Sequence, residues 1–238
     1  MFATIEEIAL IIVAYLIGSF PYMAILSRIK GIYVGREEDY HLAIWQKMGR
    51  LAGLSGIAVD VLKGAIPILI GFLFDFRLAI TVSAGIASVI GQMWPVFQRF
   101  NGGKGNTTGA GMALVLALFL WNDALLVFYC CLFCFFIGFL VRIIRGFSKS
   151  GKTIDEKLNI GGHPSNSMPL GMLAGFVVLP IASVIFNQPL EMTICFFVMV
   201  IIIIIRRLTS NLDTDLKKTK TSVAKILLNR FLFDRSHY

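Results

Sequence analysis

The stretch that decides the fold is Leu190–Ile205, which reads LEMTICFFVMVIIIII and carries one charged side chain, Glu191, near its start. An apolar run of this kind, followed directly by Arg206 and Arg207, is typical of a transmembrane helix that ends at a cationic membrane surface. The whole chain has the same character: 57% of its 238 residues are hydrophobic, 15% are charged, and the mean hydropathy is +0.79. Soluble domains carry about a quarter charged residues. The composition therefore excludes an ordinary soluble domain and predicts a protein of the lipid bilayer.

Seven segments are apolar enough to be predicted as membrane spans, since a span needs roughly 20 mainly apolar residues. The fourth and the seventh are short, and either could begin in the interface or end against other helices. The predicted fold class is all-α, a polytopic integral membrane protein of about seven transmembrane helices. The segments are Ile8–Leu26, Leu51–Phe74, Leu78–Phe97, Gly105–Trp121, Ala124–Val141, Met168–Phe186 and Leu190–Ile205.

The distribution of positive charge predicts the orientation of these spans. All but two of the 22 lysines and arginines fall in four segments, which are Arg28–Arg50, Arg99–Lys104, Arg142–Lys157 and Arg206–Arg235. Positive charge collects on the cytoplasmic face, so we expect the N terminus outside and the C terminus, with its basic tail (206–238), in the cytoplasm. The basic residues behind the net charge of +8 lie mainly on one predicted face of the membrane. This distribution favours membrane lipids as partners and not nucleic acid.

No repeat or linker divides the chain, so we expect one membrane-embedded domain over residues 1–238. The tail segment Thr221–Phe233 interleaves basic and apolar side chains. It could form a helix that lies on the anionic leaflet or one that packs on the protein, and the pattern does not decide between them. The four cysteines lie inside apolar runs, where cysteine behaves as a small hydrophobe, so we expect no metal site.

Residues 91–109, GQMWPVFQRFNGGKGNTTG, hold the strongest candidate for a binding site. Gly102, Gly103 and Gly105 flank Lys104 at the predicted start of a span. Glycines let backbone amides approach an anion, and a helix start offers free N–H groups and a positive dipole end. Thr107 and Thr108 add hydroxyl donors, and Arg99, Arg206 and Arg207 could complete a cationic pocket for a phosphate. The alternative is a flexible loop with an interfacial lysine, and both interpretations stay open.

The second candidate is a pair of charges inside the second span. Asp60 and Lys63 are three residues apart, so they share one helix face and can pair. Charges within a span are costly and are functional candidates by default. A structural ion pair that fixes helix packing is the alternative interpretation.

Taken together, these stretches resemble the acyl-phosphate–glycerol-3-phosphate acyltransferase family, PlsY. The family's Gly-Ser-x-Pro motif matches Gly18–Pro21, which contains Ser19, and its Asp-Val-x-Lys-Gly motif matches Asp60–Gly64. Its Gly-His-x-x-Pro-x-Phe-x-x-Phe-x-Gly-Gly-Lys-Gly-x-x-Thr motif matches Gly91–Thr108 at every fixed position except Gln92, which replaces the histidine. The resemblance is clear over the first half of the chain and weaker beyond it.

The resemblance implies an enzyme of the bacterial cell membrane that moves an acyl chain from acyl phosphate to glycerol 3-phosphate and so makes lysophosphatidic acid for phospholipid synthesis. It implies no metal and no cofactor, and we expect a monomer. Lys104, Gln92 and Asn106 become the candidate catalytic residues, and the Gly-Gly-Lys-Gly stretch becomes the phosphate site.

The chain departs from the family pattern at the residues expected to bind glycerol 3-phosphate. The family's serine- and asparagine-containing loop corresponds here to Glu37–Gln46, which is shorter and acidic, and a late His-Arg-x-Asn-Ile pattern survives only loosely in Arg206–Leu212. The alternative interpretation is therefore a membrane protein that retains the fold and an anion site but has lost catalysis or changed its acceptor.

Overall fold

The computed structural model describes residues 4–32, 44–45, 47–120, 123–147, 167–210, 212–218 and 222–234. Within these ranges the regular structure is entirely helical, which confirms the predicted all-α fold class. The elements are α1 (Ile5–Ser19), α2 (Tyr22–Ile29), α4 (Arg50–Leu73), α5 (Leu78–Met93), the short 3₁₀ helix η1 (Val96–Gln98), α6 (Asn106–Leu120), α7 (Asp123–Phe147), α9 (Ser167–Ile185), α10 (Leu190–Thr209), α11 (Leu212–Lys218) and α12 (Val223–Phe233).

Six helical segments in the described residues are long and apolar enough to cross a membrane. They correspond to six of the seven predicted spans. The remaining one, the predicted fourth span, is α6, which has 15 residues and is too short to cross a typical bilayer unaided. The predicted first span is divided into α1 and α2 at Phe20-Pro21, because proline has no backbone N–H to continue the helix ladder.

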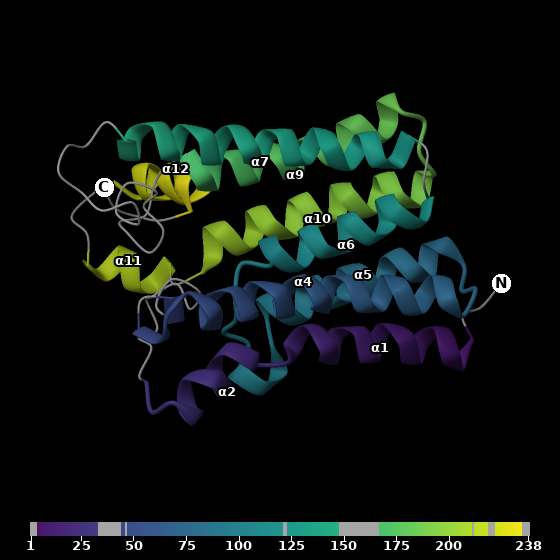
Figure 1. The fold of residues 1–238 in the computed structure, drawn as a ribbon, viewed down its shortest axis with the longest axis horizontal. Coiled ribbons are helices and arrows are strands. Elements are labelled where there is room, and N and C mark those ends of the chain that lie inside the picture. Colours follow the sequence, from purple (N-terminus) through teal and green to yellow (C-terminus); the bar gives the residue numbers. More distant parts are fainter. Residues whose placement is uncertain are drawn as a thin grey trace.

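The helices form one bundle in which neighbours in space are not always neighbours in sequence (Figure 1). Helices α1, α4 and α5 pack together on one side, and α7 packs against α9 on the other. Helices α6 and α10 lie between these two groups. The main core is drawn from α4 through α10 and includes Met112, Phe176 and Phe196. Many large apolar side chains face outward, such as Phe133 and Ile201, as expected of a surface solvated by lipid.

Glycines allow two helix pairs to approach closely. A Cβ atom added at Gly64 of α4 would lie 1.8 Å from the Thr108 carbonyl oxygen of α6, and one at Gly111 would lie 2.1 Å from the Val61 oxygen. A Cβ at Gly18 of α1 would similarly meet the Ser88 oxygen of α5 at 2.0 Å. Since close backbone approach is the main source of packing between helices in lipid, these glycines set the geometry of both pairs.

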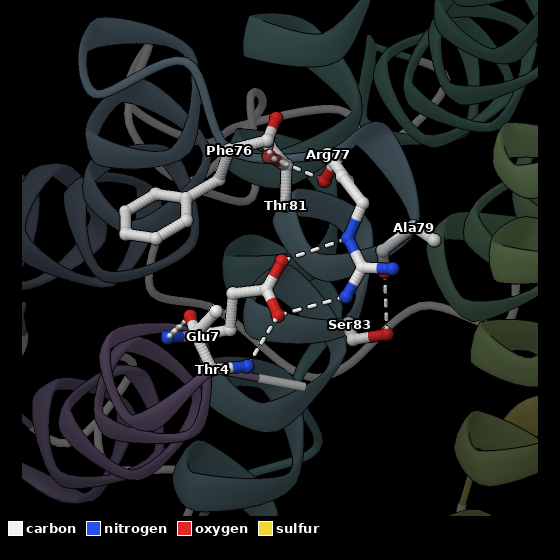
Figure 2. Close-up of polar contacts among 7 residues, drawn as sticks. All are labelled: Thr4, Glu7, Phe76, Arg77, Ala79, Thr81 and Ser83. Carbon is white, nitrogen blue, oxygen red and sulfur yellow. Dashed lines mark hydrogen bonds and ion pairs between the residues drawn. The ribbon is translucent and has the colours of Figure 1, made fainter. Parts of the chain in front are cut away.

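An ion pair joins α1 to the start of α5 at one end of the bundle (Figure 2). The Arg77 guanidinium donates two hydrogen bonds to the Glu7 carboxylate, at 2.8 and 2.7 Å. These hydrogen bonds raise the pKa of Arg77 above its usual value. Glu7 also closes a capping box with Thr4 at the start of α1. The Asp75–Arg77 turn therefore lies at the same end as the start of α1, as the predicted alternation of sides requires, while the orientation in the membrane stays a prediction.

Helix α12 packs on the protein against α9 and α10, with Ile226 and Arg230 buried. Of the two alternatives left open for the tail, the structure favours the packed helix. The prediction that concerns the loop Glu37–Gln46 falls largely outside the described residues.

Candidate functional site

The predicted Asp60–Lys63 pair is confirmed, and a third residue completes it. The Lys63 Nζ atom donates to Asp60 Oδ1 at 2.8 Å and to Gln92 Oε1 at 2.7 Å, while Gln92 Nε2 donates to Asp60 Oδ2 at 2.9 Å. Asp60 and Lys63 are 2% and 5% exposed. Each of the three side chains bonds to both others, so the two buried opposite charges and the amide stabilise one another.

Gln92 also connects this cluster to the glycine-rich loop. Its backbone carbonyl accepts the N–H of Gly103 at 3.0 Å, and the Met93 carbonyl accepts the N–H of Gly102 at 3.3 Å. The prediction that these two glycine amides face an anion is therefore wrong, because both are directed back to the end of α5. A Cβ at Gly102 would lie 2.3 Å from the Gln92 oxygen, so the glycine is needed for this close approach.

Gly105 supplies the turn into α6. Its φ of +74° lies in the left-handed region, and an added Cβ would meet Met93 Cε at 2.4 Å. The first N–H groups of α6, which begins at Asn106, have no partner within the helix. The predicted helix start is thus confirmed, with Gly105 in the backbone conformation that glycine adopts at least cost.

Arg206 holds the glycine-rich loop from the end of α10. Its guanidinium donates to the carbonyls of Gly102 and Gly103, at 2.7 and 3.1 Å, and lies 5.6 Å from the centre of the Trp94 ring. The structure brings this arginine to the loop as predicted, although its contacts are with backbone oxygens and an aromatic face.

Lys104 pairs with a carboxylate from the far end of the chain. Its Nζ atom lies 2.8 Å from Asp234 Oδ2, and it also donates to the Asp234 backbone carbonyl at 3.4 Å. The Lys104 side chain is 40% exposed, whereas the Asp234 side chain is 8% exposed. Asp234 follows the last turn of α12 and has a left-handed backbone, with φ +60°.

Two further arginines fix the end of α12 beside this pair. Arg207, which is 1% exposed, donates to the carbonyls of Phe231 and Pro169. Arg230 donates to the Arg207 carbonyl and pairs with Asp215. Burial lowers the pKa of the Arg230 guanidinium, and attraction to Asp234 partly offsets this effect. The Asp234 carboxylate is also within electrostatic range of Arg206 and Arg207.

The first turn of α6 holds two buried polar atoms without partners among the described residues, Asn106 Oδ1 and Thr108 Oγ1. Within the described residues, Asn106 Nδ2 donates to the Met172 sulfur, at 3.7 Å. Thr107 is partly buried beside them. Buried polar atoms normally have a hydrogen-bond partner, so these two oxygens are candidates for contact with a substrate.

Two predicted site residues lie elsewhere. Arg99 is exposed and has no polar partner in the described part of the chain, so its part in a phosphate pocket stays a prediction. The left-handed backbone at Arg99 and Phe100 turns the chain there. Ser19 is buried and donates to the Gly91 carbonyl at 3.4 Å, which places it in the contact between α1 and α5.

Sequence reasoning missed three residues of this region: Trp94, Arg230 and Asp234. Trp94 stands inside the quoted motif, but nothing in the pattern indicates its arginine partner 112 positions later. Asp234 follows an amphipathic tail whose packing partner the sequence does not specify.

The charges around Lys104 leave an excess of positive charge. Lys104, Arg206, Arg207 and Arg230 face Asp234 and Asp215, whereas the interior cluster is neutral overall. We call the two cations Lys104 and Arg206, beside which the Asp234 carboxylate lies, the cationic seat. Its chemistry suits an anion such as a phosphate or a carboxylate.

A family model described as glycerol-3-phosphate acyltransferase matches residues 8–218 of the chain. Curated relatives include a glycerol-3-phosphate acyltransferase from Rubrobacter xylanophilus, 34% identical over 47% of this chain and 57% of the relative. Another, from Bacillus velezensis, is 36% identical over 52% of this chain and 66% of the relative. The chain thus spans about half to two thirds of the length of these relatives.

Two crystal structures of PlsY, an integral membrane glycerol 3-phosphate acyltransferase, have the same fold. One is the lysophosphatidic acid form, with a TM-score of 0.64 and 22% identity over 89% of this chain and 92% of that one. The other is the glycerol 3-phosphate form, with a TM-score of 0.64 and 23% identity over 93% and 98%.

Proposed function

Because the chain belongs to the glycerol-3-phosphate acyltransferase family, we propose that it transfers an acyl chain from acyl phosphate to the 1-hydroxyl of glycerol 3-phosphate and releases lysophosphatidic acid. The observation that carries the proposal is the cationic seat. Lys104 and Arg206 come together at the glycine-rich loop although they are 102 positions apart in the sequence. Both substrates are phosphate esters or anhydrides, and cations at a helix start suit them.

In this reaction all bonds that form and break belong to the substrates, and the protein forms no covalent intermediate. The acceptor hydroxyl oxygen attacks the acyl carbonyl carbon, the bond from that carbon to the phosphate oxygen breaks, and phosphate leaves with its electron pair. The hydroxyl proton passes to a phosphate oxygen of one of the substrates, so no catalytic triad is required. The protein must hold two phosphates, align the hydroxyl and stabilise the negative charge that develops on the carbonyl oxygen.

We assign these tasks to different parts of the site. Lys104 and the first N–H groups of α6 bind a phosphate, and Asn106 and Thr108 offer polar atoms that a substrate could engage. Gln92 acts through the loop and not on the substrate, since its amide is engaged with Asp60 and Lys63 while its carbonyl holds Gly103. We further propose that the protein works as a monomer in the cytoplasmic membrane of a bacterium.

An acyl-transfer assay tests this function. Purified full-length protein in detergent or lipid is incubated with a long-chain acyl phosphate and radiolabelled glycerol 3-phosphate, and labelled lysophosphatidic acid is separated and counted. Glycerol and other phosphorylated polyols, offered in parallel, test the acceptor. Transfer to glycerol 3-phosphate above the rate of a Lys104→Ala variant is expected. Absence of transfer to every acceptor by folded protein would refute the function and favour a non-catalytic membrane protein.

A further inference from the structure

The C-terminal helix α12 lies beyond the part of the chain that matches the family model. The match ends at residue 218, and α12 spans Val223–Phe233. Figure 1 shows α12 beside α9 at the end of the bundle where α10 also ends. The seat residues Lys104 and Arg206 belong to the matched part, so the contact between Lys104 and Asp234 joins the matched part of the chain to the segment that follows it.

The helix is held in place by buried polar contacts. Arg207 donates to the Phe231 carbonyl in the last turn of α12, at 3.2 Å, and Arg230 donates back to the Arg207 carbonyl at 3.3 Å. Arg230 is 4% exposed and Ile226 is 1% exposed. These contacts fix the position of the residue that follows the helix, which is Asp234.

Asp234 presents its carboxylate to the seat. The carboxylate lies 2.8 Å from Lys104 Nζ and is itself largely buried, and the Asp234 N–H donates to the Arg230 carbonyl. A carboxylate and a phosphate both offer anionic oxygens to a lysine. Lys104 is 40% exposed, so a dissolved anion can reach it and compete with the aspartate.

We propose that Asp234 is an autoinhibitory ligand: its carboxylate occupies the position at Lys104 that a substrate phosphate must take, so α12 limits the affinity of the seat for phosphate. The inference rests on the proposed phosphate role of Lys104. An intramolecular competitor reduces the apparent affinity for every anion by the same factor. That factor is set by the fraction of molecules in which the seat is free. Movement or removal of the end of α12 would release this restraint.

Binding of radiolabelled inorganic phosphate to the purified full-length protein, measured by equilibrium dialysis, tests the proposal. Asp234→Asn and Asp234→Gly both remove the charge, and both residues accept the left-handed backbone found there. We expect each variant to bind phosphate about fivefold more tightly than the wild type, as for loss of a partly exposed ion pair. The matched control is Asp213→Asn, which removes the same charge from an exposed position on α11 and should leave binding unchanged.

Lys104→Ala separates the two hypotheses. If phosphate binding requires Lys104 but neither Asp234 variant strengthens it, autoinhibition is refuted and the phosphate seat stands. If no variant binds phosphate, or if the gain from Asp234→Asn persists in the Lys104→Ala background, both the seat and its inhibition are refuted. Unfolding temperatures of all variants, measured in the same detergent, should agree within a few degrees.

Discussion

The side chain of Gln92 shows how one amide can stabilise two buried charges. A glutamine amide carries both a hydrogen-bond acceptor and donors, so Gln92 can accept from Lys63 and donate to Asp60 at the same time. The cluster therefore gives each charge two polar neighbours inside an apolar bundle, where an unpaired charge would be costly.

Single substitutions in this cluster should destabilise the protein more than paired ones. Asp60→Asn removes the carboxylate that pairs with Lys63, and Lys63→Met removes the ammonium that pairs with Asp60, so each should cost about 3–5 kcal/mol. The double variant removes both charges and should lose much less than the sum of the two. Thermal unfolding of the four proteins in one detergent measures this coupling, and simple additivity would argue against an energetic pair.

Lys104→Ala should abolish acyl transfer while leaving the fold intact. Its ammonium is partly exposed and bonds to Asp234 alone among the described residues, and an ion pair of this kind contributes at most about 1 kcal/mol to stability. Activity is measured by the transfer assay and folding by the unfolding temperature. A variant that retains more than a tenth of the wild-type activity would contradict a phosphate role for this lysine.

The residues of the site were only partly predictable. The spacing of Asp60 and Lys63 on one helix was enough to predict their pairing, because helix geometry fixes which side chains meet. Gln92 is 29 positions away from Lys63 and could not be assigned to that pair. The contact depends on how α5 packs against α4, which the spacing of residues within one helix does not determine. The amides of Gly102 and Gly103 were misassigned for the same reason, because their partners lie across a loop.

Among the helices, α4 and α6 approach each other at two glycines, Gly64 and Gly111, and Gly64 makes the closer approach. Gly64 stands where α4 approaches the backbone of α6 at Thr108, and the next residue toward the N terminus is Lys63 of the interior cluster. The position of Gly64 in the Asp-Val-x-Lys-Gly motif thus has a packing reason, distinct from any chemistry of the motif.

Gly64→Ala should destabilise the protein by about 1–3 kcal/mol, because the added methyl group would force the two backbones apart. Ala58→Leu adds more bulk at an exposed position of the same helix and serves as the control. Unfolding temperatures report the difference. Equal effects of the two substitutions would show that general bulk in α4, and not this contact, is responsible.

The helices themselves followed from composition more closely than the site did. Apolar runs predicted every long span. A single segment that crosses lipid must satisfy its own backbone hydrogen bonds, and only a helix does so. The break at Phe20-Pro21 was less predictable, because a proline can kink a helix or end it. The shortness of α6 was expected from its sequence, since the glycine-rich stretch precedes it and the polar pair Asn122-Asp123 follows it closely.

For the molecule as a whole, the charge distribution predicts that the N terminus lies outside the cell and the C terminus in the cytoplasm. Single cysteines placed at Asp75 or Gln188 in a variant without native cysteines should react with a membrane-impermeant maleimide in intact cells. Cysteines at Lys104 or Lys217 should react only after the membrane is opened. The positive-inside rule is the physical reason. Reaction of the Lys104 position in intact cells would reverse the predicted orientation.

The contact between Glu7 and Arg77 has a consequence for biosynthesis. Its two partners are 70 positions apart, so when α1 leaves the ribosome its carboxylate has no counterion, and the arginine is translated only after α4. Until then Glu7 must remain near water at the membrane surface, since a lone charge is not readily moved into the hydrocarbon layer. Helix α1 therefore stays at the membrane interface until α5 has been synthesised. A ribosome stalled before residue 77 should leave α1 loosely inserted and open to protease.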